Sequence, residues 1–349
     1  AQVRLEFRWC STLPILTRAN MVHFGLLTLL VAGVSCRAAA FSTLGAAPGT
    51  QSLHLRSAAA PMAGKDSDPS SSNSFRIFSA VAAVTAAAVT LAATRRPVVG
   101  GNWKCNPDSM SKLDGLIANI NACDTSKCDV YVCPSPLHVA YCAEKFTNGA
   151  LVTPQNCNFT GCGAFTGEMA VEQMKDMGIS QVLIGHSERR GEFGIFPMDD
   201  NTTLATKLKY ILDAGLTCVF CIGEPKPIRE QGLDAVLAEM DVQLSQIYEL
   251  LDPAKVVIAY EPVWAIGTGL TATPEDAQAT HLGIRNLIAE KASEEVAAAI
   301  RIQYGGSANA ANAPQLSEQP DVDGFLVGGA SLKPEIADIV AAISAAKES

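Results

Sequence analysis

Several apolar runs of the sequence end in polar side chains that carry out acid–base chemistry in enzymes. The run "QVLIG" is followed by His186 and Glu188, the run "VVIAY" by Glu261, and the run "PVVGG" leads to Lys104. A carboxylate base, an imidazole and a lysine together suit proton transfer beside a carbonyl group, because the two nitrogen groups stabilise the negative charge that forms. This chemistry requires the side chains to meet in space.

Taken one at a time, these residues also have structural explanations. A lone histidine is more often a satisfied structural residue, Lys104 could be a solvated charge, and Glu261 could cap a following helix. However, Glu261 precedes Pro262, which holds its backbone near β geometry. A carboxylate at the mouth of an apolar strand is partly desolvated, and this favours a role as a base. The combination is therefore more informative than any single member.

Two glycine-rich turns predict a second kind of site. "YGGS" ends at Ser307, and "VGGASL" contains Gly328 and Gly329. Such turns expose backbone N–H groups, which bind phosphate without requiring many cations. The sequence shows no GxxxxGK[ST] motif and no evident cluster of metal ligands, so we expect neither a nucleoside triphosphate nor a metal.

Eight short, mostly apolar runs are typical of strands buried on both faces, as in a parallel sheet. They cover residues 97–103, 129–133, 150–156, 181–187, 216–224, 255–261, 300–306 and 323–329. Helical patterns lie between them, and the one at 273–292 begins with Thr273 as N-cap and Pro274 in its first turn. We predict a (β/α)₈ barrel over 97–349, which would bring the strand ends to one rim. An open doubly wound sheet usually carries a GxGxxG motif after its first strand, and none is found here.

Charge is distributed unevenly along the 349 residues. Residues 1–96 contain nine basic and three acidic side chains, whereas residues 97–349 contain 17 basic and 32 acidic ones, a net charge of −15. An acidic globular part argues against nucleic acid as a partner, because phosphate backbones bind to basic surfaces. The eleven cysteines show no regular disulfide framework, so we expect mostly buried or free thiols, including Cys218 and Cys221 within one strand.

We predict that residues 1–96 form a targeting extension, largely unstructured or helical. Residues 21–40 resemble a signal peptide, and residues 41–76 are basic, Ser-rich and poor in acids, like a transit peptide. This order is typical of proteins sent through the secretory route into a complex plastid; a mitochondrial, secreted or membrane-tethered protein is the alternative. Residues 77–94 are apolar and uncharged, at the lower length limit for a membrane span, so we expect membrane contact only there.

Residues 97–349 resemble the triosephosphate isomerase family over essentially their whole length. The matching stretches, in order, are "GGNWKCN", "QNCNFTGCGAFTGE", "IGHSERR", "CIGE", "AYEPVWAIGTG", "YGGSANAANA" and "GFLVGGASLK". The resemblance implies a TIM barrel that interconverts dihydroxyacetone phosphate and D-glyceraldehyde 3-phosphate through an enediolate, without a cofactor.

The resemblance also implies roles for individual residues. Glu261 matches the base that moves a proton between adjacent carbons, His186 matches a neutral imidazole that polarises the carbonyl, and Lys104 matches the cation that stabilises the developing charge. The residues matched to substrate binding are Asn102, Lys104, Gly267, Ser307, Gly328 and Gly329. "PVWAIGTG" (262–269) matches the lid that closes over the phosphate.

The resemblance further implies a homodimer. The loop 161–168 matches the segment that reaches into a second subunit, where Thr166 would lie near Asn102 and Lys104 of the partner. One departure from the family concerns Ile195, which stands where a glutamate normally pairs with the arginine of the "HSERR" motif. That arginine is Arg189 here, and we expect Asp199 or Asp200 to replace the missing carboxylate.

Two other functions remain open from the sequence. A barrel aldolase acting on a sugar phosphate often needs a Schiff-base lysine inside the barrel, but Lys255 lies at the start of its strand, away from the rim. A catalytically silent or membrane-tethered barrel could instead serve as a binding protein, and the apolar stretch 77–94 is the best support for it. The intact Lys104, His186 and Glu261 favour the isomerase.

Overall fold

The computed structural model of the chain describes residues 95–191, 198–266 and 271–348. The segments 21–40, 41–76 and 77–94, which the sequence analysis interpreted as targeting signals and an apolar helix, lie outside these residues. Within the described part, no helix combines the length and the apolar character needed to cross a membrane.

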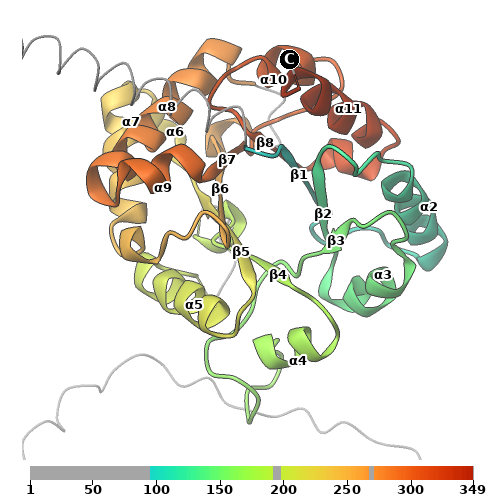
Figure 1. Cartoon of the computed structure of the whole chain (residues 1–349). Helices are drawn as coiled ribbons and strands as arrows, with labels where there is room; N and C mark the ends of the chain where they lie inside the picture. Colours follow the sequence, from blue (N-terminus) through green and yellow to red (C-terminus); the bar gives the residue numbers. More distant parts are fainter. Residues whose placement is uncertain (1–94, 192–197, 267–270, 349) are drawn as a thin grey trace, which may run out of the picture. The chain divides into compact units, whose positions relative to one another are not determined.

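Eight parallel strands form the central barrel (Figure 1). They are β1 (Val98–Asn102), β2 (Asp129–Cys133), β3 (Leu151–Val152), β4 (Gln181–Ile184), β5 (Thr217–Ile222), β6 (Val256–Tyr260), β7 (Arg301–Tyr304) and β8 (Gly324–Val327). Hydrogen-bonded neighbours follow the order β3-β2-β1-β8-β7-β6-β5-β4. Each strand lies within a predicted apolar run, so the predicted (β/α)₈ architecture is confirmed.

Two contacts bring β3 and β4, the ends of this order, together. The backbone N–H of Leu183 donates to the carbonyl oxygen of Pro154 at 2.9 Å. Inside the barrel, Thr153 Oγ1 donates to Gln181 Oε1, also at 2.9 Å. Because β3 has only two residues, these bonds follow its end and draw its continuation against β4, which nearly closes the barrel.

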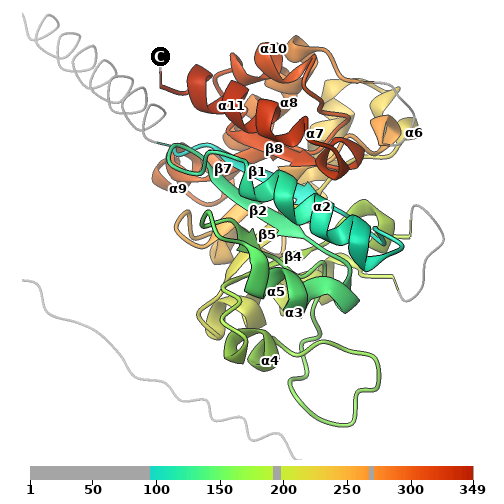
Figure 2. The same cartoon turned by 90° about the vertical axis from the view of Figure 1, so that its right-hand side faces the viewer.

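Helices surround the barrel, as Figures 1 and 2 show. They are α2 (Met110–Asn121), α3 (Val139–Lys145), α4 (Val171–Asp176), α5 (Asn201–Asp213), α6 (Lys226–Arg229), α7 (Leu233–Leu244), α8 (Pro274–Lys291), α9 (Glu294–Ala299), α10 (Ala313–Ser317) and α11 (Ile336–Ala346). The predicted helix start is confirmed in α8, where the Thr273 side chain accepts from the N–H of Asp276 and Pro274 occupies the first turn. Buried apolar side chains fill the space between helices and strands.

The interior of the barrel is packed around one large ring. Tyr131 of β2 is only 1% exposed, and its hydroxyl donates to Gln303 Oε1 of β7 at 2.8 Å. Gly100 is paired with Tyr131 in the sheet, and a Cβ atom there would lie 2.0 Å from the Tyr131 ring. Glycine at position 100 is therefore required by the close approach of this ring.

The cysteines of the described part are free thiols, as predicted. Cys218 and Cys221 are both buried within β5 rather than at a helix start. Burial raises the pKa of both thiols well above its ordinary value, so they remain protonated. The Cys-x-x-Cys spacing is thus a consequence of strand packing.

Arg95 belongs to the folded barrel, two residues before its predicted start at Pro97. Its Nε donates to Asp323 Oδ1 at 2.7 Å, and its Nη1 and Nη2 donate to the carbonyl oxygens of Ala298 and Pro320. The Arg95 side chain is 5% exposed. This arginine therefore anchors the segment before β1 to Asp323, the residue that precedes β8.

Replacing Arg95 by leucine should lower the free energy of unfolding by about 2 kcal/mol, because charge-assisted hydrogen bonds of a buried guanidinium are lost. Arg96→Leu is the matched control: the Arg96 side chain is 45% exposed in its ion pair with Asp129. Exposed pairs contribute little, so we expect a change below about 1 kcal/mol. Urea unfolding of both variants checks this, and equal losses would contradict a special role for Arg95.

Candidate active site

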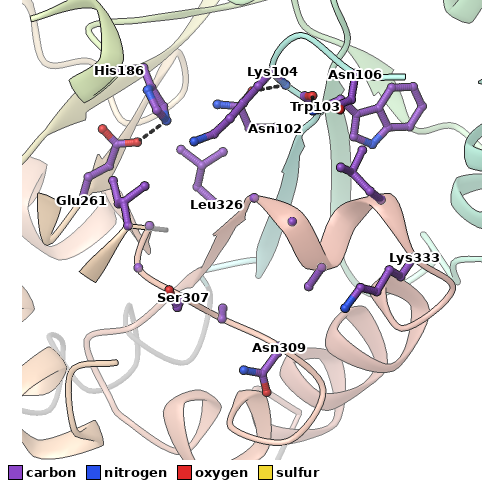
Figure 3. A pocket seen from close by; sticks show the side chains of 18 of the residues that line it. Asn102, Trp103, Lys104, Asn106, His186, Glu261, Ser307, Asn309, Leu326 and Lys333 are labelled. Carbon is purple, nitrogen blue, oxygen red and sulfur yellow. Dashed lines mark hydrogen bonds and ion pairs between the residues drawn. The ribbon is translucent and has the colours of Figure 1, made fainter. Parts of the chain in front are cut away.

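A cavity of about 470 Å³ opens at the carboxyl ends of the strands. The predicted residues that line it are Asn102, Lys104, His186, Glu261, Ser307, Gly328 and Gly329. They come from the ends of β1, β4, β6, β7 and β8. Figure 3 shows five of them around one space: Asn102, Lys104, His186, Glu261 and Ser307. Gly267, the remaining predicted binding residue, lies outside the described residues. We call this space the front cavity.

Glu261 follows β6 directly and is 1% exposed. Its Oε1 lies 2.9 Å from His186 Nε2, and its Oε2 accepts from the backbone N–H of Ser187 at 2.9 Å. The Glu261 backbone N–H in turn donates to the Ile222 carbonyl oxygen at 2.7 Å. The carboxylate is thus held at the wall of the front cavity by neighbours from β4 and β5.

His186 is oriented by a backbone hydrogen bond. Its Nδ1 accepts from the N–H of Glu188 at 3.2 Å, at the start of the short 3₁₀ helix Ser187–Arg189. An accepting Nδ1 carries a lone pair, so this hydrogen bond assigns the proton of a neutral ring to Nε2. The imidazole therefore presents an N–H donor at the front cavity, on the side where Glu261 also lies (Figure 3).

Lys104 occupies an unusual backbone conformation. Its φ is 52°, and among the described residues it is the one non-glycine residue with a positive φ. Asn102 Oδ1 accepts from its backbone N–H at 3.0 Å, and Gln155 Nε2 donates to its carbonyl oxygen at 2.8 Å. The ammonium group lies 2.7 Å from Glu188 Oε1. A strained backbone conformation of this kind is typical of functional sites. Here it belongs to the residue whose charged side chain lines the front cavity.

Ser307 lies on the side of the front cavity away from Lys104 (Figure 3), whereas the turn with Gly328 and Gly329 follows β8, the neighbour of β1 in the sheet. Ser307 Oγ donates to the Ala265 carbonyl oxygen at 2.8 Å, which ties the turn after β7 to the segment after β6. A Cβ atom at Gly328 or Gly329 would meet nothing within 4 Å. These glycines therefore leave room for a ligand next to their backbone rather than for a packed side chain.

The sequence profile described as triosephosphate isomerase matches residues 97–343. The chain belongs to the triosephosphate isomerase family. The triosephosphate isomerase of Coprinopsis cinerea is 45% identical over 251 residues, covering 71% of this chain and 98% of the relative. The triosephosphate isomerase of Taenia solium is 44% identical over 250 residues, which cover 71% of this chain and 98% of the relative. That of Saccharomyces cerevisiae is 43% identical over 246 residues, which cover 69% of this chain and 96% of the relative.

The departure from the triosephosphate isomerase pattern at Ile195 is compensated nearby. Ile195 itself lies outside the described residues, but Arg189 Nε donates to Asp199 Oδ2 at 2.9 Å. Of the two predicted candidates, Asp199 is therefore the carboxylate that pairs with Arg189 in place of the missing glutamate. Asp200 has another task, because its side chain accepts from the N–H of Thr203 and caps α5.

Asp199 also neutralises a buried lysine. Lys207 Nζ donates to Asp199 Oδ1 at 2.7 Å, and both side chains are 5% exposed. Asp199→Asn should therefore lower the free energy of unfolding by about 3 kcal/mol, because it leaves a buried ammonium without its counter-ion. The control is Asp200→Asn, since asparagine caps a helix about as well as aspartate. Denaturant unfolding that gave the same loss for both variants would contradict this.

The sequence did not reveal the contact between Ser187 and Glu261. The hydrogen bond comes from the Ser187 backbone, so its residue type carries no signal for it. Gln155, which supports Lys104, was missed for a similar reason: it follows β3, which is separated from β1 by β2, and it acts on a backbone carbonyl. Among the described residues, the lysines that line the front cavity are Lys104 and Lys333, and both lie outside the barrel interior, where an aldolase would place its Schiff-base lysine.

Proposed function

We propose that Glu261, His186 and Lys104 catalyse the reaction of the family to which this chain belongs. The chain is an isomerase that interconverts dihydroxyacetone phosphate and D-glyceraldehyde 3-phosphate. The observation that supports the assignment of residues is the meeting of one buried carboxylate and one imidazole, 2.9 Å apart, at the wall of the front cavity.

In this proposal, Glu261 takes the proton from the carbon next to the carbonyl group and returns it to the adjacent carbon. The Nε2–H of His186 donates to the substrate oxygen and passes its proton to the enediolate oxygen as the double bond moves. Lys104 stabilises the negative charge that appears on these oxygens. To reach substrate, Glu261 must leave the N–H of Ser187, which holds it at the cavity wall.

The phosphate group of the substrate would lie against the glycine-rich turns. Backbone N–H groups at Ser307, Gly328 and Gly329 would bind its oxygens, and Asn102 would support Lys104 at the other end of the molecule. The full chain, assayed with either triose phosphate and no added cofactor, tests the activity directly. A protein unable to form the other triose would contradict the proposed function.

We further propose a homodimer formed through the loop 161–168. The residues Cys162–Glu168 are exposed, and Phe165 at the tip of the loop is 42% exposed. Figure 2 shows this loop projecting from the barrel between β3 and α4. Thr166 would then approach Asn102 and Lys104 of the partner subunit. Sedimentation of the full chain should give twice the monomer mass, and a stable monomer with full activity would contradict the dimer.

For localisation, we propose import into a plastid through the secretory route, with residues 21–40 as signal peptide and 41–76 as transit peptide. The support is the composition of the leader alone. Mitochondrial import and tethering through 77–94 are the competing possibilities. Fluorescence of a full-length fusion in the source cell, with mapping of the mature N-terminus, distinguishes all three.

The second candidate function, a silent or tethered binding protein, is not favoured. It would not require Glu261, His186 and Lys104 to line one cavity, as they do here.

A further inference from the structure

A second cavity also has Glu261 in its lining. It measures about 400 Å³, and its lining includes Ser187, Arg190, Gly223 and Gln243. Among the described residues, Glu261 is the single residue that lines both this space and the front cavity. We call the second space the rear cavity. Ser187, whose backbone N–H holds the Glu261 carboxylate, also lines the rear cavity.

The lining of the rear cavity is suited to water. Most of its side chains are polar, and its volume exceeds that of several waters, each of which takes up about 30 Å³ in the liquid. Ser187 is 2% exposed, yet its Oγ finds no hydrogen-bond partner among the described residues. Since buried hydroxyl groups are normally satisfied, an unpartnered hydroxyl on a residue that lines this cavity supports the presence of ordered water there.

The rear cavity runs from the buried carboxyl group towards the surface. At its inner end lie Ser187 and Glu261, both nearly inaccessible to solvent. At its outer end lie Asp200, which is exposed, and the partly exposed Ile228 and Glu239. Asp200 and Glu239 place carboxylate oxygens where a chain of waters would leave the protein.

The charges along this route are otherwise neutralised or bound. Arg190 donates from Nε to the Gly185 carbonyl oxygen, from Nη1 to Asn201 Oδ1 and from Nη2 to the Cys221 carbonyl oxygen. Asp199 is held between Arg189 and Lys207. Among the described residues of this lining, the groups left to pass on a proton to water are Ser187 Oγ and the carboxylates of Asp200 and Glu239. Each carboxylate accepts one hydrogen bond, Asp200 from the Thr203 N–H and Glu239 from Gln243 Nε2, and keeps a second oxygen.

We propose that the rear cavity is the route by which Glu261 exchanges protons with solvent while a substrate fills the front cavity. The inference rests on the proposed role of Glu261 as the base. After it has taken a proton from the substrate, the neutral carboxyl donates that proton to a water near Ser187 Oγ and accepts another from the same chain of waters. Charge and atoms balance, because one proton leaves for each proton that arrives.

The exchange can be measured separately from turnover. In D₂O, protiated D-glyceraldehyde 3-phosphate gives dihydroxyacetone phosphate that carries at C1 either the original hydrogen, transferred directly, or deuterium from solvent. Proton NMR of the product gives the ratio. Ile228→Trp in the full chain fills the outer part of the rear cavity, and we expect the directly transferred fraction to rise roughly twofold or more, because exchange is slowed. Ile228→Val, which leaves the cavity open, should match the wild type.

Ser187→Ala is the second variant, since it removes the inner hydroxyl but keeps the backbone N–H that holds Glu261. It should raise the directly transferred fraction as well. An unchanged fraction in both Ile228→Trp and Ser187→Ala would overturn the route. If Glu261 were not the base, the Glu261→Gln variant would retain turnover. If only the proposed route were wrong, turnover would still depend on Glu261, but Ile228→Trp and Ser187→Ala would not change the directly transferred fraction.

Discussion

Replacing Glu261 by glutamine is expected to lower kcat by about 10⁴-fold, the upper end of what a general base contributes. Glutamine keeps the shape of the side chain and an oxygen that accepts from the Ser187 N–H, but it does not take up the substrate proton. Steady-state rates in both directions measure the effect, and circular dichroism shows that the fold is kept. Glu261→Asp should lose about 10²-fold, because the carboxylate retracts by roughly 1 Å.

Glu335→Gln is the matched control for this experiment. Glu335 also lines the front cavity, but it faces Lys333 at 3.3 Å rather than the imidazole. We expect its kcat to stay within about threefold of the wild type, because no step assigns it a proton. A Glu261→Gln enzyme with more than about a tenth of wild-type turnover would remove Glu261 from the role of base.

The second large effect is expected from Lys104→Met, with kcat/KM lower by about 10³-fold. Lys104 lines the front cavity, where the negative charge is proposed to develop, and the loss of its ammonium group also removes the ion-pair partner of Glu188. That carboxylate would add repulsion against both the enediolate and the phosphate. Rates measured at several substrate concentrations separate the loss in kcat from the rise in KM.

Lys112→Met controls for the change of lysine to methionine. Lys112 lies on α2 and pairs with Asp108, with its side chain 65% exposed. Exposed pairs contribute little, so activity and stability should change only slightly, by less than about 1 kcal/mol. If Lys104→Met were as active as Lys112→Met, the cation would have no part in catalysis.

The sequence predicted the strands well because their chemistry is local. A run such as "VVIAY" is apolar throughout, and the structure buries all of β6. Polar residues placed directly after such runs, Glu261 and His186 among them, were then brought to one cavity by the barrel alone. Periodicity and spacing were sufficient for this part of the site.

Contacts made by backbone groups or across the barrel were not predictable in the same way. The hydrogen bond from Ser187 N–H to Glu261 depends on the fold of two distant strand ends, and any residue type offers that N–H group. The choice between Asp199 and Asp200 was open in the sequence because both are acidic neighbours. It is decided by the start of α5, which uses Asp200 as its cap and turns Asp199 inward to Arg189.

The start of the barrel shows the same limit. Arg95 comes at the end of a leader that is itself basic, so the sequence favoured assigning Arg95 to the leader rather than to the barrel. Its partner Asp323 lies 228 positions along the chain, and only the folded barrel brings the two side chains together.

The most direct test of the proposed catalysis is to add D-glyceraldehyde 3-phosphate or dihydroxyacetone phosphate, in separate tubes, to the purified full-length chain without any cofactor. NMR would follow both compounds over time. The account predicts that both tubes reach the same ratio of the two trioses, and that the Glu261→Gln chain leaves each starting compound largely unchanged over the same period. A wild-type chain that converts neither compound, or a Glu261→Gln chain that reaches the common ratio as quickly, would contradict it.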